Sequence, residues 1–233
     1  MLSTLLSGKF TMEQIFANIF AVLLVVFIIL PIHEWAHAIT AYALGDKSIK
    51  ASGRLTINPL SHIDPIGALM LLLIGFGWAK PVPINPSYFK HPKLGMAITA
   101  FMGPFSNLVA AFLGMVVFNI IIRVNPDIMF NSGDFSLQHS LIWYFFSYFV
   151  SINISLAVFN LIPIPPLDGS KVLFLFLPNK AVEFMYRYQQ IFYIVLFVLL
   201  WVGALNGVLR FCTDWVGNGL SWLAELPFKA FSN

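Results

Sequence analysis

Residues 15–44 read IFANIFAVLLVVFIILPIHEWAHAITAYAL. The first 18 of these residues carry no charge, and the apolar pattern continues past two histidines to the end of the stretch. Such a run exceeds the core of a signal peptide and matches the roughly 20 residues that cross a bilayer. We therefore predict a retained membrane-spanning helix that carries His33, Glu34 and His37 within it.

The composition of the whole chain also indicates a membrane protein. Of its 233 residues, 59% are hydrophobic and 10% are charged, whereas an ordinary soluble domain is about 25% charged. A water-soluble globular protein is therefore excluded, and one membrane domain is expected to fill residues 1–233. The net charge of +3 is small and its charges are scattered, which argues against a nucleic-acid-binding surface.

Three further segments are long and apolar enough to cross a bilayer, at residues 94–122, 140–162 and 188–211. Residues 65–78 form a shorter apolar segment, which suits a re-entrant piece better than a full crossing. Residues 47–58 mix β-branched and polar side chains and predict a short strand or hairpin. The expected fold is an all-α polytopic membrane protein with about four full spans, one re-entrant segment and a small β-hairpin-like insertion.

Within this single domain, we expect a core at about residues 15–177, an extra span at 188–211 and an interfacial tail at 212–233. The tail places Trp215, Trp222 and Phe228 among polar residues. That mixture is typical of an amphipathic segment at a membrane surface.

The basic residues predict how the chain is oriented in the membrane. If residues 65–78 do not cross, nine of the 13 Lys and Arg residues lie on one side and four on the other; if they cross, the split is seven to six. The positive-inside rule favours the unequal split. Both termini are then expected outside the cytoplasm, residues 45–93 face the cytoplasm, and the expected location is the cell membrane of a bacterium.

The sequence HEWAH at residues 33–37 has the pattern H-E-x-x-H. On a helix, its two histidines lie one turn apart on one face and can bind one zinc ion, with Glu34 beside the metal as a candidate base. The single cysteine, Cys212, excludes a thiolate cage. The alternative is a pair of packing histidines with a protonated Glu34. A charge near mid-bilayer costs on the order of 3 kcal/mol unless a ligand or cavity compensates, which favours the metal site.

A catalytic zinc site needs a third protein ligand. We assign this role to Asp168, which ends a run whose three prolines prevent regular helix where a span should continue. Broken backbone at membrane depth is tolerated where it lines a cavity. The residues alone leave one alternative open, in which residues 163–169 are the exit turn of the third span and Asp168 caps the next helix at the water surface.

These motifs resemble those of the site-2 protease family of intramembrane zinc metalloproteases. HEWAH resembles the family's H-E-x-x-H, and NLIPIPPLDG at residues 160–169 resembles its N-x-x-P-x-x-x-L-D-G. GPFSN at residues 103–107 is similar to the small-residue motif of the intervening core helix. The stretches GRLTINPLSHIDPIGAL and FGWAKPVPINP are similar to those of the short subgroup without a PDZ domain. The resemblance covers about residues 24–177.

The resemblance implies one zinc ion per chain and a role for each motif residue. His33, His37 and Asp168 would hold the metal. Glu34 would act as a base on the attacking water, and Asn160 would hydrogen-bond the substrate backbone or the oxyanion. Asn160 can equally be a polar residue that joins helices. The implied partners are membrane-protein substrates cleaved in or near their transmembrane segments, within the lipid bilayer.

Several nearby residues receive a structural interpretation. We interpret Asn107 as a residue for close helix packing beside Gly103, and His62 and Asp64 as turn residues. Residues 47–58, if they form a strand, offer a backbone edge to an extended substrate.

Functions of two other classes compete with proteolysis. Histidines and acids inside spans also mark metal or proton transporters, although the sequence repeats neither the acid–histidine cluster nor the broken segment in a second half. A membrane scaffold that keeps zinc only for stability is the other candidate, but it would not require Glu34. The sequence does not define an oligomeric state.

Overall fold

The structure is a computed structural model that describes residues 10–74, 79–125 and 137–229, and its regular elements there are all helices. The main helices are α2 (Met12–Leu24), η1 (Val25–Ile29), α3 (Leu30–Ala43), α6 (Pro65–Ile74), α7 (Pro92–Val124), α9 (Leu137–Asn160), α10 (Asp168–Phe174), α11 (Asn179–Arg187), α12 (Gln189–Trp201) and α13 (Asn206–Lys229). Shorter turns are α4 (Ser48–Ala51), α5 (Pro59–His62) and η2 (Pro86–Tyr88). The predicted all-α class is confirmed.

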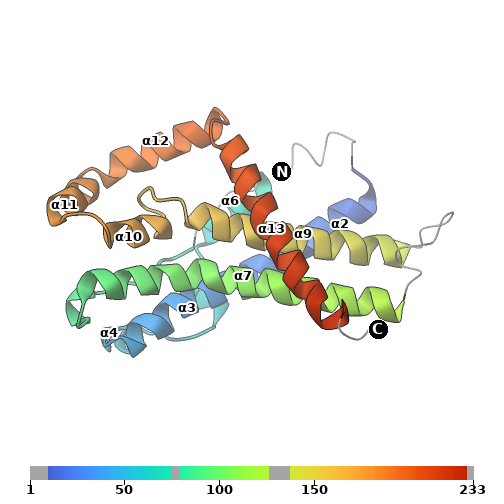
Figure 1. The fold of residues 1–233 in the computed structure, drawn as a ribbon, viewed down its shortest axis with the longest axis horizontal. Coiled ribbons are helices and arrows are strands. Elements are labelled where there is room, and N and C mark those ends of the chain that lie inside the picture. Colours follow the sequence, from blue (N-terminus) through green and yellow to red (C-terminus); the bar gives the residue numbers. More distant parts are fainter. Residues whose placement is uncertain (1–9, 75–78, 126–136, 230–233) are drawn as a thin grey trace.

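Within residues 10–74, 79–125 and 137–229, three helices are long and apolar enough to cross a membrane, at Met12–Ala43, Pro92–Val124 and His139–Asn160. The same described residues contain up to four spans if α11 and α12, which are bent by 70°, count as one. Figure 1 shows α7 and α9 side by side, with α13 lying across both, and these pairs are in contact. The chain is therefore a multi-pass helical membrane protein.

The first span contains one π-helical turn, η1, between α2 and α3. The amide of Leu30 donates to the carbonyl of Val25, five residues back. Pro31 explains this wider turn, because proline has no amide hydrogen to donate to Phe27 and its ring collides with a carbonyl in regular helical geometry. The π turn lies immediately before the turn that carries the two histidines, and such turns are frequent at functional sites.

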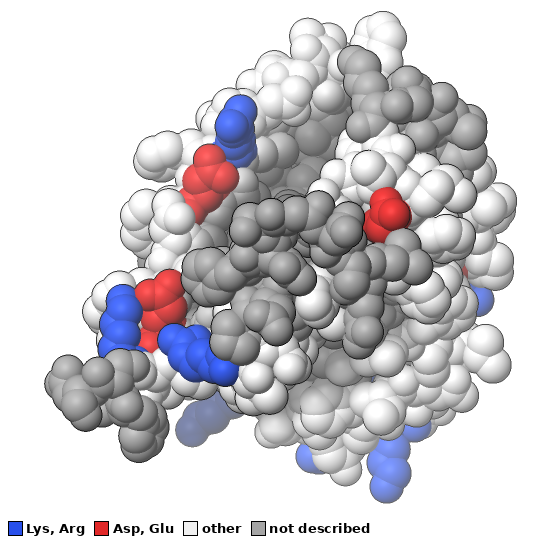
Figure 2. All heavy atoms as spheres, turned by 90° about the vertical axis from the view of Figure 1, so that its right-hand side faces the viewer, with Lys and Arg blue, Asp and Glu red and all other residues white. Residues whose placement is uncertain are grey.

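The long helix α7 has one face for packing and another for lipid. Its buried residues are mostly small, which lets neighbouring helices approach closely; they include Gly95, Ala97, Ala100, Gly103, Ala111 and Gly114. Large apolar side chains are exposed elsewhere on the helix, at Phe101, Phe105, Leu113, Val117 and Ile120. These small buried and large exposed residues suit a helix in a bilayer. Figure 2, which looks at the molecule from the right-hand end of Figure 1, shows a few charged side chains among uncharged ones on the described surface there.

The predicted β-hairpin at residues 47–58 is wrong. These residues form the helical turn α4 and then an irregular segment, and the described residues contain one isolated bridge, between Ile63 and Ala79, instead of a sheet. Local side-chain bonds explain the difference: Asp46 accepts from the Ser48 amide, and Thr56 Oγ1 accepts from the Asn58 amide. Such bonds compete with strand pairing.

The predicted C-terminal span at 188–211 is not one continuous helix. Helix α12 ends at Trp201, and Gly203 has a φ of 76°, the left-handed conformation in which glycine commonly ends helices. Helix α13 then begins at Asn206, so most of the predicted tail at 212–233 forms a helix that packs on α7 and α9. Residues 230–233 lie outside the described residues.

Helix α6 covers the described part of the predicted re-entrant segment, Pro65–Ile74. Residues 75–78, the end of that segment, lie outside the described residues, so whether the segment crosses the membrane stays a prediction.

A cavity of about 1040 Å³ lies between α7, α9 and α13, far along α7 from its buried Gly103. Its lining includes Asn119, Arg123, Trp143, Thr213, Asn218 and Glu225. None of the residues predicted to bind metal contributes to it.

Candidate metal centre

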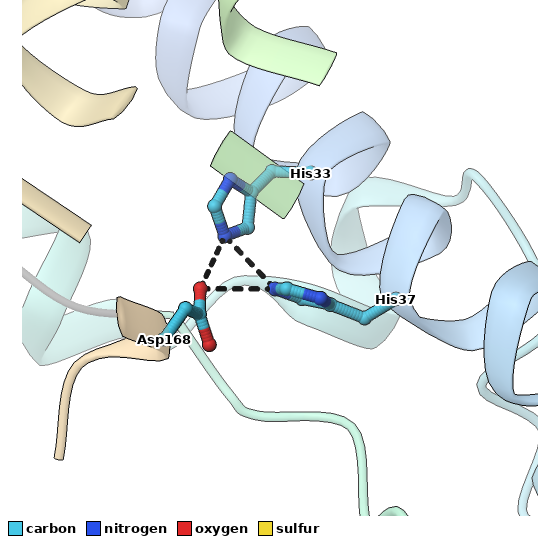
Figure 3. Close-up of side chains that lie close together, drawn as sticks. All are labelled: His33, His37 and Asp168. Atoms are coloured by element: carbon cyan, nitrogen blue, oxygen red, sulfur yellow. Dashed lines mark hydrogen bonds and ion pairs between the residues drawn. The ribbon is translucent and has the colours of Figure 1, made fainter. Parts of the chain in front are cut away.

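Three side chains from two distant parts of the chain converge in the interior. Nε2 of His33 and Nε2 of His37 are 3.1 Å apart, and Oδ2 of Asp168 lies 3.4 Å from the first and 3.2 Å from the second. All three residues are buried, with Asp168 only 8% exposed. Figure 3 shows the two rings of α3 and the carboxylate of α10 pointing toward one another. The structure thus brings together the three predicted ligands.

The other nitrogen of each histidine ring has a partner on α7. Nδ1 of His37 is 2.7 Å from the backbone carbonyl of Thr99, and Nδ1 of His33 is 3.2 Å from Oδ1 of Asn107. A carbonyl only accepts, so Nδ1 of His37 carries the proton in a neutral ring and Nε2 presents its lone pair. Metal-bound histidines are oriented by such second partners.

This arrangement fits a metal cation. With both Nδ1 atoms protonated, two nitrogen lone pairs and a carboxylate oxygen face the same small space, and no hydrogen is available there to separate them. Three converging acceptors repel one another unless a cation lies between them. Within the described residues, this is the one group of three or more His, Cys, Asp or Glu side chains that could hold a metal. Nitrogen and carboxylate donors in this number suit zinc.

Helix α7 can approach the ligands only because residue 103 is glycine. A Cβ atom at Gly103 would collide with the ring of His37 and would lie 2.7 Å from Nε2 of His33. The glycine therefore allows the helix backbone to form a wall directly against the ligand atoms.

The proline-rich run at the end of α9 places Asp168. The backbone leaves the helix after Asn160, and Asp168 then begins α10 with Leu167 as the N-cap. Gly169 lets this turn pack directly against the carbonyl of Leu161, which an added Cβ would hit. The second carboxylate oxygen, Oδ1, accepts a hydrogen bond from Nζ of Lys171 at 2.9 Å. Asp168 is buried, whereas the alternative left open by the sequence places it at the water surface as a helix cap.

Glu34 contacts an extended segment, residues 79–85, which we call the strap. Oε2 of Glu34 accepts from the backbone amide of Val82 at 3.2 Å. The strap is anchored on both sides of this contact, because the Lys80 amide donates to the His62 carbonyl and the Asn85 amide donates to the buried Asp46. Val82 itself packs in a core cluster with Ala38, Ala41 and Ile49 of the first span and the turn after it.

The remaining predicted residues have the following positions. Asn160 ends α9 and donates to the Leu156 carbonyl at 3.0 Å; no interaction described for it reaches the cluster, so its substrate role stays a prediction. His62 is buried and bonds the Thr56 carbonyl, and Asp64 accepts two amide bonds at the start of α6. These contacts agree with turn roles.

Four residues at this site are missed by sequence reasoning. Asn107 contacts a ligand, so its interpretation as a packing residue is incomplete, and Thr99, Val82 and Lys171 receive no role from the motifs. Two of the four contacts use backbone atoms, which no residue type reveals. Only Lys171 has a usable signal, because it lies three residues after Asp168 on the same helix face.

Comparison with known proteins identifies the family of the chain. The family model described as Peptidase family M50 matches residues 124–203, which include Asp168 but not the two histidines. No solved structure matches the chain.

Two relatives extend the comparison to more of the chain. "Putative zinc metalloprotease YwhC" of Bacillus subtilis is 37% identical over 169 residues, or 72% of this chain and 74% of the relative. "Putative zinc metalloprotease Rip2" of Mycobacterium tuberculosis H37Rv is 24% identical over 227 residues, or 95% of this chain and 80% of the relative. By these similarities, the chain belongs to the M50 peptidase family, the site-2 protease family of intramembrane zinc metalloproteases.

Proposed function

We propose that this chain is a zinc-dependent endopeptidase that hydrolyses peptide bonds in or near the transmembrane segments of membrane proteins. The observation that carries the proposal is the convergence of the buried residues His33, His37 and Asp168, with Glu34 next to His33 on the same helix. Structural zinc sites are closed by four protein ligands, whereas catalytic sites use three and leave a position for water or substrate. Three ligands next to an acid that need not bind the metal match the catalytic type.

Each residue has a defined task in this proposal. His33, His37 and Asp168 would hold one zinc ion per chain, which would supply a Lewis acid that activates water and polarises a carbonyl. Glu34 takes the proton from the attacking water and delivers it to the nitrogen of the leaving amine. Thr99 and Asn107 hold the histidine rings in the orientation that presents both Nε2 atoms.

The Val82 amide supports the role of Glu34 as a base. It engages one carboxylate oxygen, Oε2, and so fixes the side chain while the other oxygen can accept a proton. Pro81 and Pro83 flank Val82 and restrict the strap to an extended backbone. The base is therefore held by the main chain of a segment that is itself anchored at Lys80 and Asn85.

The substitution Val82→Pro is expected to lower kcat by up to about 10²-fold, the scale of loss that follows a misplaced catalytic group, while zinc is retained. It removes the amide hydrogen and keeps an extended backbone. Val82→Ala is the matched control, because it keeps the amide but loses the buried side chain. Peptidase assays with metal analysis of both variants distinguish them, and equal activities would show that the amide has no part in catalysis.

The assignment of Asp168 as third ligand is tested by metal content. We expect purified wild-type protein to contain one zinc per chain and Asp168→Ala to lose most of it, because two histidines alone leave the site one ligand short. Glu183→Ala on the exposed surface of α11 is the control for loss of an acid. An Asp168→Ala protein with full zinc occupancy and activity would exclude this assignment.

We also propose that the protein resides in the cell membrane with the metal site toward the cytoplasm. The nine-to-four distribution of basic residues supports this orientation, and the short apolar segment at residues 65–78 supports the non-crossing path on which that distribution depends. At 1.5 Å per residue, His33 lies about 16 Å from the end of the first span.

Cysteine labelling tests this topology. Two variants, Ser52→Cys and Ser87→Cys, are made separately in a Cys212→Ser background, and the two positions flank α6 in the chain. We expect each introduced cysteine to react with a membrane-impermeant reagent only when the cytoplasmic side of the membrane is exposed. Labelling of the two positions from opposite sides would mean that the segment crosses the bilayer.

A further inference from the structure

The two oxygens of the Asp168 carboxylate face different partners. Oδ2 faces both histidines at 3.2 and 3.4 Å, whereas Oδ1 accepts a hydrogen bond from Nζ of Lys171 at 2.9 Å. The pair is shielded from water, since the side chain of Asp168 is 11% exposed and that of Lys171 is 28% exposed.

Because the two oxygens have different partners, the number of ligand atoms that Asp168 offers to a metal depends on Lys171. A carboxylate can bind a cation through one oxygen or through both. Charge-assisted bonds are about twice as strong as neutral ones, and this bond holds Oδ1 away from the histidine nitrogens. With Oδ1 held, the protein offers three donor atoms, and a tetrahedral ion then keeps one position open.

Resting on the proposed function, we infer that Lys171 is a positioning residue that restricts Asp168 to binding zinc through one oxygen and so preserves the open position for water. Without the ammonium group, Oδ1 is a buried anionic oxygen that lacks this partner. It is then drawn to the nearest cation, the metal, and a carboxylate bound through both oxygens occupies the position that water needs.

An ordinary surface ion pair is the competing explanation. Pairs three or four residues apart on an exposed helix contribute little to stability, and removing one leaves a distant site unchanged. The pair between Glu183 and Arg187 on α11 is of this type, with an N–O distance of 3.2 Å and exposed side chains. It provides a matched control.

The experiment replaces zinc with Co²⁺ in purified full-length protein and records the visible absorption at saturating Co²⁺. Four-coordinate Co²⁺ absorbs several-fold more strongly than five-coordinate Co²⁺, so the spectrum reports coordination directly. The variants are Lys171→Met, Lys171→Gln, Lys171→Arg and the control Arg187→Met. Zinc affinity and kcat are measured on the same preparations.

We expect an intense four-coordinate spectrum for wild type, Lys171→Arg and Arg187→Met. We expect a weaker, five-coordinate spectrum for Lys171→Met and Lys171→Gln, with kcat lowered by about 10–100-fold, the usual cost of removing a group that orients a metal ligand.

A wild-type spectrum and full kcat in both neutral variants would overturn the inference, as would failure of both to bind saturating Co²⁺ while Arg187→Met binds it. Wild-type protein that binds no Co²⁺ at all would instead contradict the proposed metal centre.

Discussion

The Glu34→Gln protein is expected to keep its zinc and lose at least about 10²–10⁴-fold of its peptidase activity, the contribution of a positioned general base. Glutamine has nearly the same size, and its carbonyl oxygen can still accept from the Val82 amide that now binds Oε2. The substitution therefore removes the ability to carry a proton and little else.

The measurement uses purified protein in liposomes with a single-span model substrate that carries a helix-destabilising residue near mid-membrane, because a helix hides its carbonyls in its own hydrogen bonds. Glu183→Gln on the exposed surface of α11 is the matched control. A transporter would show changed metal or proton flux, and a structural zinc protein would change little in either assay. Undiminished cleavage by zinc-loaded Glu34→Gln would falsify the mechanism.

The second large effect is expected from a single added methyl group. Gly103→Ala places a Cβ against the His37 ring and 2.7 Å from Nε2 of His33. Because the rings are buried and tied to α7 through Nδ1, they cannot move aside without losing those bonds. We expect zinc affinity to fall at least about 10–100-fold and activity to fall with it.

Gly219→Ala on α13 provides the control for this substitution, because a Cβ there meets nothing within 4 Å. Zinc titration of the two purified variants, with a thermal melt of each, separates a damaged site from a damaged fold. If Gly103→Ala bound zinc as tightly as Gly219→Ala, the close approach of α7 to the ligands would be irrelevant to metal binding.

The two motifs predict the ligand cluster well because the chemistry restricts the residue types. HEWAH places two imidazoles on one helix face by periodicity alone, and a proline-broken run with an acid inside an apolar chain is costly without a function. The spacing of the two motifs does not predict which atoms hydrogen-bond Nδ1 of His33 and of His37. The partners Thr99 and Asn107 come from tertiary packing of α3 on α7, which one sequence does not display.

The errors in the fold have a different origin. The segment at 47–58 has strand-like composition, but Asp46 and Asn58 form local bonds that stabilise turns. The break before α13 depends on one glycine, Gly203, within an apolar stretch, and hydropathy does not detect the left-handed backbone that ends a helix there. Apolarity predicts where spans lie better than where they stop.

The π turn at Val25–Ile29 has a consequence for which changes of chain length the first span tolerates. Ala21 before the turn packs with Phe149 of α9, whereas the histidines after it face α7. A π turn contains one residue more than an α-helical turn, so deleting one residue from it restores regular helix and leaves Ala21 facing α9 and the histidines facing α7. The same deletion within α2 or α3 instead rotates the two faces by about 100° relative to each other, since an α-helix has 3.6 residues per turn. The first span therefore tolerates a change of length inside the π turn better than one on either side of it.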